Sequence, residues 1–404
     1  LILQGFLYWF LLIAIETGYL ERVRAMMGGR RKGKEGKEEN TKDSIEDSDV
    51  VEEREAVLRM DRNKALVVVK NLRKRFGKLE AVRGVSFHVG VGDCFGFLGV
   101  NGAGKTSTFR MLTGECPVSA GDAFVEGSSV VDDWRKAGEN VGYCPQFDAV
   151  MEELTGEDAL LLMGRIRGID RHEIHKVVWG VVEAIGIGQY AKRRIESYSG
   201  GNKRRLSLGL ALIGMPKVLL LDEPTTGVDP RAKRTIWDIL DKVRQAGCAI
   251  VLTSHSMDEC EALCSRLAIM ARGQFRCHGS IQHIKSRYGT GYTLLVRIAE
   301  HGDPERVKRR TLTTFPRAKL KEHHLIQLNF EIPRTASETW SGLFEKTEML
   351  SRELQWEDYT LSQTTLEQVF LEFSREAEAS DRNRGGSSVS KERFMYDNEC
   401  FVRL

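Results

Sequence analysis

The sequence lacks several features that mark broad classes of protein. Its eight cysteines are scattered without any C-x-x-C pair, which argues against a disulfide framework or a zinc site and is typical of reduced, cytosolic thiols. The net charge is only +3, with 29% charged residues, so the composition does not point to a nucleic acid or another charged polymer as a partner. With 404 residues the chain is long enough for two or three domains.

The apolar run at residues 1–15 is shorter than the roughly 20 residues that span a bilayer, and it lacks the basic start and cleavage site of a signal peptide. Positive charge just beyond an apolar segment marks the cytoplasmic side of a membrane. Because residue 1 is Leu, we interpret residues 1–20 as the end of the last transmembrane helix of a longer, integral membrane protein. A buried helix of a soluble domain is the alternative. The basic residues that follow the run are Arg22, Arg24, Arg30, Arg31, Lys32, Lys34 and Lys37.

Residues 21–63 are rich in Gly and charged residues and keep no apolar stripe, so we expect a mostly solvated, charged linker on the cytoplasmic side. A short helix is possible in its last part, residues 50–59. Residues 377–404 are polar and rich in Gly and Ser, and we expect a disordered tail there.

The stretch FGFLGVNGAGKTSTFRML contains the pattern G-x-x-x-x-G-K-[ST], from Gly99 to Thr106. Gly102 and Gly104 lack Cβ atoms, so the backbone can bend around a phosphate chain. A helix that begins near Lys105 would place its positive end at the same point. Lys105 is expected to reach the β- and γ-phosphates, and the Thr106 hydroxyl is expected to hold Mg²⁺.

A second chemical signal is the apolar run at residues 218–221, which ends in Asp222-Glu223. Such a run is typical of a buried parallel strand, and α/β sheets bind ligands at the carboxyl ends of their strands. Asp222 would support the Mg²⁺ shell and Glu223 would polarise an attacking water. Ser199 and two glycines at a helix start form another anion-binding end, or a plain helix cap. Phe76 is either a core aromatic or a ring that stacks on a nucleobase.

Together these motifs resemble an ATP-binding cassette (ABC) ATPase, and more narrowly the A subfamily of ABC transporters. The similarity covers roughly residues 66–288 and is closest to the second nucleotide-binding domain, at the C-terminal end of the full transporter. The segments that carry it are GVNGAGKTS, GYCPQFDAV, YSGGNKRRLS, LDEPTTGVDP and LTSHSMDECEALC.

The resemblance assigns roles to individual residues. Glu223 and His255 are the catalytic pair, with His255 as the switch histidine on the γ-phosphate. Asp229 lies in the loop between the two ATP sites of a domain pair. Mg²⁺ is held by Thr106, Gln146 and Asp222, and Gln146 links it to the membrane domain. The nucleotide-binding residues are Phe76, Gly99, Asn101, Gly102, Ala103, Gly104, Lys105, Thr106, Ser107 and Gln146.

The signature that closes on the partner domain's ATP is then Ser199, Gly200, Gly201 and Asn202. Tyr198 and Asn202 stand where most ABC families have Leu and Gln, which suits the A subfamily but leaves open how strongly this half-site stimulates hydrolysis.

The resemblance also implies the fold class and the domains. Residues 64–288 would form an α/β P-loop ABC ATPase domain with a parallel core sheet, an antiparallel β subdomain and a helical subdomain. The helical subdomain spans about residues 152–194 and would dock on the membrane domain, unless it is an ordinary helical insertion.

Residues 289–376 have the order strand, helix, strand, strand, helix, strand, which predicts an α+β ferredoxin-like domain. The A subfamily carries a regulatory domain here, although the pattern itself allows a mere packing appendage. A final helix is expected from Thr364 and Thr365, with Leu366, Val369, Phe370 and Phe373 on one face.

These observations predict an ATP- and Mg²⁺-dependent ATPase domain that drives export or flipping of a lipid-like substrate across a membrane. Its partners would be the second nucleotide-binding domain and the transmembrane domain of the same transporter, and no nucleic acid is expected. One alternative is a soluble ABC ATPase not involved in transport, against which the apolar run counts. The other is a binding module that has lost catalysis, against which Lys105, Glu223 and His255 argue.

Overall fold

The computed structural model describes residues 47–289, 291–298, 303–324, 326–333, 339–363 and 365–382. The expected transmembrane segment, most of the expected linker and residues 383–404 of the expected tail lie outside these ranges. Within them, no helix combines the length and the apolar character that crossing a membrane requires. We call residues 47–289 the main domain and residues 291–363 the C-terminal lobe.

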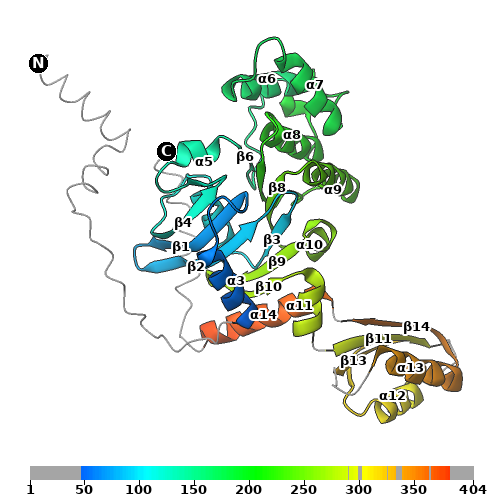
Figure 1. Cartoon of the computed structure of the whole chain (residues 1–404). Coiled ribbons are helices and arrows are strands. Elements are labelled where there is room, and N and C mark those ends of the chain that lie inside the picture. Colours follow the sequence, from blue (N-terminus) through cyan, green and yellow to red (C-terminus); the bar gives the residue numbers. More distant parts are fainter. Residues whose placement is uncertain are drawn as a thin grey trace, which may run out of the picture. The chain divides into compact units, whose positions relative to one another are not determined.

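The main domain is built on a six-stranded sheet of order β10-β9-β3-β8-β7-β6 (Figure 1). All neighbouring strands are parallel except β9 and β10. Every residue of β3, β7 and β8 is buried, as expected for parallel strands covered on both faces. The bounds are β3 (Cys94–Leu98), β6 (Val141–Cys144), β7 (Val218–Asp222), β8 (Ala249–Ser254), β9 (Arg266–Ala271) and β10 (Gln274–Gly279).

A second, antiparallel sheet of order β2-β1-β4-β5 packs on the core sheet through phenylalanine rings. Phe87 of β2 stacks on Phe95 with ring centroids 4.9 Å apart and meets Phe97 edge-on at 5.1 Å. The two sheets therefore share one core. The strands of the second sheet are β1 (Val67–Phe76), β2 (Leu79–Val89), β4 (Ala120–Val125) and β5 (Ser128–Ser129).

Helices cover the core sheet, and the segment between β6 and β7 contributes a separate helical part in which α6 and α7 pack on each other (Figure 1). Leu160, Val178, Val182 and Ile185 are buried there, which confirms the expected helical periodicity. The helices of the main domain are α3 (Ser48–Arg59), α4 (Lys105–Leu112), α5 (Trp134–Gly138), α6 (Gly156–Ile166), α7 (Ile174–Ala184), α8 (Gly200–Leu212), α9 (Pro230–Gln245), α10 (Met257–Leu263) and α11 (Ile281–Tyr288), with a short 3₁₀ turn at Ile195–Ser197.

The short helix considered for the end of the linker is present as α3, and it is docked rather than solvated. Val57 is fully buried, and Glu53 makes a 2.7 Å contact with His88 of β2. Asp49 pairs with Arg287, at the end of α11. The sequence suggested a linker because the acidic residues of α3 are spread along it, while their basic partners lie far away in the chain.

The C-terminal lobe has the expected βαββαβ order, with a four-stranded antiparallel sheet of order β12-β13-β11-β14. Its second helix starts later than expected, because Thr339 caps it by accepting a hydrogen bond from the Gly342 amide. The elements are β11 (Gly291–Ile298), α12 (Pro304–Thr314), β12 (Lys319–His324), β13 (Gln327–Pro333), α13 (Trp340–Leu354) and β14 (Trp356–Gln363).

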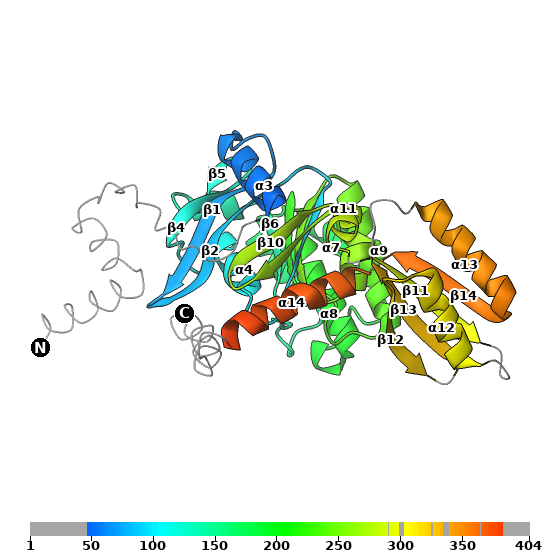
Figure 2. The ribbon, with the colours of Figure 1, turned by 90° about the horizontal axis from the view of Figure 1, so that it is seen from below.

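The last helix, α14 (Leu366–Arg382), packs back on the main domain (Figure 2). Leu366 and Val369 are buried in the main domain's core cluster, and the Phe373 ring meets Tyr288 of α11 with centroids 5.3 Å apart. The expected apolar face of this helix is thus confirmed. The helix extends to Arg382, so residues 377–382 are helical and not part of the expected tail.

Candidate functional site

The loop between β3 and α4 has the geometry of a phosphate cradle. Lys105, the first residue of α4, is only 4% exposed, and its Nζ donates to the carbonyl oxygens of Gly99 at 2.7 Å and Val100 at 3.3 Å. Gly104 precedes the helix, and no side chain caps the helix amides. The positive end of α4 is therefore directed at the space that the loop encloses.

Two glycines hold this loop against its neighbours. A Cβ on Gly99 would lie 2.7 Å from the carbonyl oxygen of Met270, and a Cβ on Gly104 would lie 2.7 Å from that of Ala81. Gly104 also has a φ of +108°, which other residues rarely adopt. Any side chain at either position would push the loop away from the strands that shape it.

The carboxylates Asp222 and Glu223 stand at the carboxyl end of β7, and both are buried. Glu223 has a φ of +48°, in the left-handed region. Its backbone N–H donates to Thr253 Oγ1 at 3.0 Å and to the Thr253 carbonyl at 3.1 Å. A non-glycine residue in this conformation persists only where its surroundings enforce it, and such positions concentrate at functional sites.

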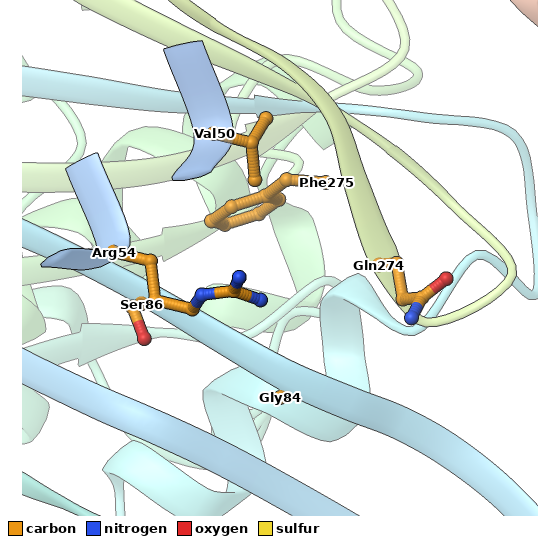
Figure 3. Close-up of a pocket in the computed structure, with 6 residues that line it drawn as sticks. All are labelled: Val50, Arg54, Gly84, Ser86, Gln274 and Phe275. Carbon is orange, nitrogen blue, oxygen red and sulfur yellow. The ribbon is translucent and has the colours of Figure 1, made fainter. Parts of the chain in front are cut away.

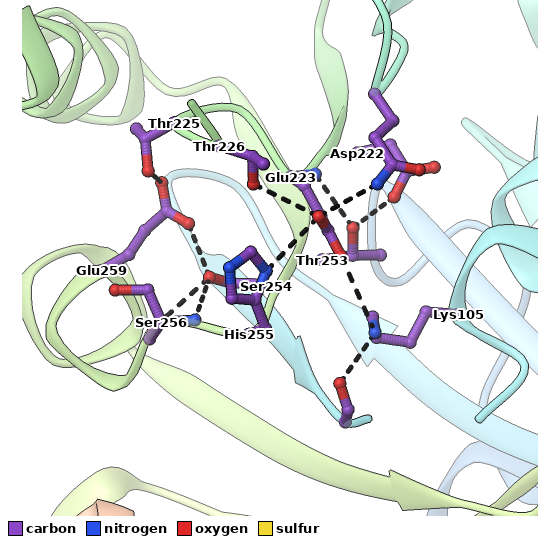
Figure 4. Close-up of polar contacts among 12 residues, drawn as sticks. Lys105, Asp222, Glu223, Thr225, Thr226, Thr253, Ser254, His255, Ser256 and Glu259 are labelled. Atoms are coloured by element: carbon purple, nitrogen blue, oxygen red, sulfur yellow. Dashed lines mark hydrogen bonds and ion pairs between the residues drawn. The ribbon is translucent and has the colours of Figure 1, made fainter. Parts of the chain in front are cut away.

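The Glu223 carboxylate is the centre of a polar network (Figure 4). Its Oε1 lies 3.9 Å from Lys105 Nζ. Its Oε2 accepts hydrogen bonds from Gln146 Nε2 at 3.1 Å and Thr226 Oγ1 at 3.2 Å, and lies 3.3 Å from Nδ1 of His255. Three of the predicted site residues, on three separate segments, are thus brought to the carboxylate of a fourth, Glu223.

Burial disfavours the charged forms of two groups in this network, Lys105 and Asp222. Burial lowers the pKa of Lys105, although the nearby carboxylates of Glu223 and Asp222 act in the opposite direction. Burial likewise raises the pKa of Asp222, against the hydrogen bond from Thr253. Groups whose charged forms are disfavoured in this way are typical of sites that complete their charge balance with a ligand.

Phe76 is the last residue of β1 and pairs with Leu79 across the β1–β2 hairpin, so it lies within the sheet. Its half-buried ring has the Lys74 ammonium 4.8 Å from its centroid. Further along β2, Ala81 contacts the loop at Gly104. The ring therefore stands at the end of the hairpin that borders the phosphate loop, and base stacking stays a prediction.

The expected signature forms the start of α8. Ser199 caps the helix by accepting a hydrogen bond from the Asn202 amide at 3.4 Å, and Gly200 is exposed with open space where a Cβ would be. The side-chain oxygen of Asn202 accepts a hydrogen bond from Arg205. The unusual Tyr198 is buried, and its hydroxyl donates to the Tyr190 carbonyl at 2.6 Å, which ties the signature to the helical part.

Asp229 lies beside this signature. It caps α9 by accepting a hydrogen bond from the Ala232 amide at 3.0 Å, and a Cβ on Gly201 would be 3.3 Å from its Oδ1. Within the described ranges, no hydrogen bond or ion pair joins Asp229 or Ser199 directly to Lys105 or Glu223. The predicted residues thus form two groups, one around the Glu223 carboxylate and one at the exposed start of α8.

A small pocket beneath α3 contains none of these residues (Figure 3). It lies between α3, β2 and β10. The residues that line it are Val50, Arg54, Gly84, Ser86, Gln274 and Phe275.

Comparison with known proteins places this geometry in a family. Residues 82–226 match the family model described as ABC transporter, and residues 289–363 match the model described as ABCA1-like, C-terminal R1 regulatory domain. The chain is 42% identical over 383 residues to the human phospholipid-transporting ATPase ABCA3, an alignment that covers 92% of this chain and 22% of the relative. The chain belongs to the A subfamily of ABC transporters.

Two further A-subfamily relatives agree. Human ATP-binding cassette sub-family A member 2 is 45% identical over 341 residues, covering 83% of this chain and 14% of the relative. Rat sub-family A member 7 is 44% identical over 349 residues, covering 86% and 16%. The chain therefore spans less than a quarter of the length of these relatives.

Solved structures support the predicted fold. The ATP-binding subunit of an ABC transporter superposes with a TM-score of 0.52 at 23% identity, over 55% of this chain and 93% of that one. A dimeric, post-hydrolysis ATP-binding cassette bound to ADP and phosphate superposes with a TM-score of 0.50 at 19% identity, over 53% and 98%. The main domain thus has the α/β fold of an ABC ATPase.

The residues at the end of β7 fit a Mg²⁺ ion of the kind that ABC ATPases use with ATP. Asp222 Oδ2 is buried and has no hydrogen-bond partner among the described residues, while Oδ1 accepts from Thr253. A buried carboxylate oxygen without a partner is costly in a protein alone and suits a hard cation that prefers oxygen ligands. Thr106, in the first turn of α4, lies near enough to this carboxylate to lower its pKa, against the larger effect of burial.

Three residues of this ABC site were not singled out from the sequence. Thr253 faces Asp222 in the β7–β8 pairing, and its place at the end of the strand before His255 was the available signal. Glu259 is buried and accepts hydrogen bonds from Thr225 at 2.8 Å and Ser254 at 2.6 Å.

Arg204 is the third of these residues, with its guanidinium buried behind the Glu223 backbone. The sequence could have indicated a buried role for Arg204, because it is a basic residue on the same helix face as the buried Leu208 and Ala211.

Proposed function

We propose that the main domain binds ATP with Mg²⁺ and hydrolyses it as one half of a nucleotide-binding pair, and that this hydrolysis drives movement of a lipid-like substrate across a membrane. The observation that carries the proposal is the convergence on one buried carboxylate. Lys105, Gln146 and His255 all lie within 4 Å of Glu223, next to the open N-terminus of α4.

In this mechanism Lys105 turns from the Gly99 carbonyl and Glu223 to the β- and γ-phosphates, whose charge restores a favourable setting for its buried ammonium. Thr106, Asp222 and the side-chain oxygen of Gln146 would hold Mg²⁺, which when bound offsets the negative charge of the phosphates. Phe76 would stack on the base, and Asn101, Gly102, Ala103 and Ser107 would line the phosphates with backbone and hydroxyl donors.

Glu223 then acts as the general base. Its carboxylate is held by Gln146 and Thr226, so it is oriented before substrate arrives. It takes a proton from the water that attacks the γ-phosphate. His255, whose side chain is 54% exposed and which contacts Glu223 on its outer side, is free to turn and donate to a γ-phosphate oxygen.

The signature residues would serve the ATP of a partner domain. Ser199 and Gly200 are exposed at the start of α8, and within the described residues no hydrogen bond or ion pair joins Ser199 to Lys105 or Glu223. Asp229, beside Gly201, would lie between the two sites of the pair. This chain alone should therefore bind ATP but turn it over slowly, since each complete site needs a loop and a signature from opposite domains.

The proposals about transport and regulation are inferred from the relatives and the matching family models. The name of one relative is phospholipid-transporting ATPase, so we infer a phospholipid-like substrate, with this region on the cytoplasmic side of the membrane. The lobe would be regulatory, in line with the R1 regulatory domain model that residues 289–363 match. The helical part around α6 and α7 would dock on the transmembrane domain.

The test is phospholipid-dependent ATP hydrolysis by the full-length protein in liposomes. We expect phosphate release to rise with phospholipid and a labelled phospholipid to change leaflet only when ATP is present. A rate of hydrolysis that does not depend on phospholipid would overturn the proposed substrate class but not the proposed ATPase activity. Release of the protein from membranes by carbonate washing would instead favour a soluble ABC ATPase.

A further inference from the structure

Arg204 on α8 makes an unusually complete set of contacts for a buried charge. Its guanidinium is 3% exposed and donates to five backbone carbonyls and one carboxylate. These acceptors lie on two segments that are not adjacent to α8 in the sequence. One is the loop that carries Gln146, and the other is the end of β7 that carries Glu223. The acceptors are the carbonyl oxygens of Pro224 (2.7 Å), Pro145 (2.6 Å), Gln146 (3.3 Å), Asp222 (3.0 Å) and Glu223 (3.0 Å), and Asp148 Oδ1 (3.1 Å).

The chemistry of the contacts requires an arginine. A guanidinium offers five N–H donors in a planar fork, so one side chain can satisfy carbonyls on two segments at once, whereas a lysine offers a single point of charge. The neighbouring Arg205 has no such reach. It donates to the carbonyls of Ile185 and Gly186, at the end of α7, and to Asn202 of its own helix.

The contact with Glu223 matters because of that residue's backbone. Glu223 has positive φ, and its peptide is held from both sides: Thr253 accepts from the N–H, and Arg204 donates to the carbonyl. The Glu223 carbonyl also accepts from the Thr226 N–H at 3.2 Å, so Arg204 is one of two donors that hold it in a conformation that a glutamate otherwise avoids. Loss of the Arg204 contact would loosen this backbone and reduce the orientation of the carboxylate toward the phosphate loop.

We propose that Arg204 is a positioning residue that joins the signature helix to the catalytic carboxylate. Ser199 caps α8 and Arg204 lies near the start of that helix, so a shift of the signature moves the guanidinium and, through it, the backbones of Glu223 and Gln146. When the signature binds the partner domain's ATP, the resulting shift of α8 thereby changes the position of this chain's own general base, Glu223. This inference rests on the proposed ATPase function.

The test compares Arg204→Lys and Arg204→Gln with a matched control in the full-length protein, with hydrolysis at the partner domain's site silenced. The control is Arg167→Gln, because Arg167 is half-buried and donates to two backbone carbonyls, of Glu139 at 3.0 Å and Val141 at 2.6 Å. Among the described residues it has no hydrogen bond to a site residue. Melting temperature, ATP affinity and kcat are measured for each.

We expect Arg204→Gln to lower kcat by about 10- to 100-fold, since misplacing a catalytic group by about 1 Å has an effect of this order. Arg204→Lys should recover part of the loss, and ATP affinity should change by less than about threefold, because Lys105 and Thr106 are untouched. Arg167→Gln should lower the melting temperature with kcat unchanged. If both arginine positions lower kcat only in proportion to melting temperature, Arg204 is merely structural and the proposal fails.

A double variant separates this failure from that of the proposed function. If Arg204 acts through Glu223, then Arg204→Gln adds little further loss of turnover to Glu223→Gln. Additive losses would overturn the positioning role while leaving Glu223 as the base. Normal turnover in Glu223→Gln itself would overturn the ATPase mechanism and not the contact.

Discussion

The main domain and the C-terminal lobe differ in the kinds of polar side chain that they bury. The main domain buries the charged residues Lys105, Arg204, Asp222, Glu223 and Glu259 around one strand end. Within the described part of the lobe, the buried polar residues are the uncharged Thr311 and Thr347. Burying a charge is costly unless it is paired or serves a ligand.

The contrast indicates where each region's function must reside. Under the proposed function, a phosphate ligand would complete the otherwise destabilising arrangement of the main domain. The lobe is packed as a folding unit around apolar side chains such as Leu294 and Phe330, so any regulatory contact has to use its surface. The predictions below test this division, from the largest expected effect to the smallest.

The largest effect is expected for Glu223→Gln. The amide has nearly the size of the carboxylate, so packing should survive while the proton acceptor is lost. General-base catalysis contributes about 10²- to 10⁴-fold in rate, or about 3–5 kcal/mol of barrier. Phosphate release should fall by that factor while radiolabelled ATP stays bound, held by Lys105, Thr106 and Asp222.

The partner domain's own site must be silenced in this measurement, since its residual turnover would mask the loss. Loss of ATP binding would make Glu223 structural or a metal ligand. Turnover that stays normal would mean that the buried charge at β7 is not the base, and the division between the two regions would lose its main support.

In the lobe, Phe330→Ala should destabilise without touching the chemistry. Phe330 is fully buried in the lobe's own core, and such truncations cost about 3–5 kcal/mol. Calorimetry should show the lobe unfolding at lower temperature with ATP affinity unchanged. Phe344→Ala is the control, since that ring is half exposed and its loss should be mild. A parallel drop in ATP affinity would show that lobe and site fold as one unit.

Lys105→Ala should weaken ATP binding by roughly tenfold or more, because a charge-assisted contact in a partly dry site is worth about 1.5–3 kcal/mol. Isothermal calorimetry measures the change. Lys217→Ala removes the same charge from an exposed pair with Glu126 and serves as the control. Equal affinities in the wild type and Lys105→Ala would mean that the loop is not the phosphate cradle.

Much of this arrangement could be predicted from the sequence because it follows from local patterns. Glycine spacing identified the phosphate loop, an apolar run placed Asp222 and Glu223 at a strand end, and periodicity gave the βαββαβ order of the lobe. These features depend on neighbours in the chain, which a sequence displays directly.

The remainder depends on contacts between distant segments. Arg204 reads as one of several basic residues in NKRRLS until α8 is packed against the end of β7. Likewise the sequence of α3 resembles a charged linker, because Glu53 pairs with His88 and Arg266 only in the folded chain. Side-chain pairing over such separations leaves no periodic signal.

The smallest effect concerns the charges beneath α3, which belong to the main domain but not to its ATP chemistry. Burial raises the pKa of Glu53, but the hydrogen bond with His88 and the charges of His278 and Arg266 outweigh it, so this pKa is lowered overall. Burial lowers the pKa of His278, whose ring stacks on Phe95.

Both groups bind protons more readily in the unfolded chain than in the folded one, so both make the main domain more stable as pH rises. The contribution of His278 is complete above its ordinary value of 6.5 and is lost as pH falls below it, while that of Glu53 is lost only below its ordinary 4.5. Of these two groups, only His278 should therefore respond to acidification from about pH 7.5 to 5.5. We expect the protection factors of the α3 amides, which compare their exchange with that of an unfolded chain at the same pH, to fall over this range. The response should be flatter in His278→Phe, which keeps a ring against Phe95 but cannot titrate. The amides of β13 in the lobe provide the internal control, because no charged group is buried beside them in the described lobe. If their exchange changed as much as that of α3, the pH effect would be global and the contrast between the two regions would not extend to their titration.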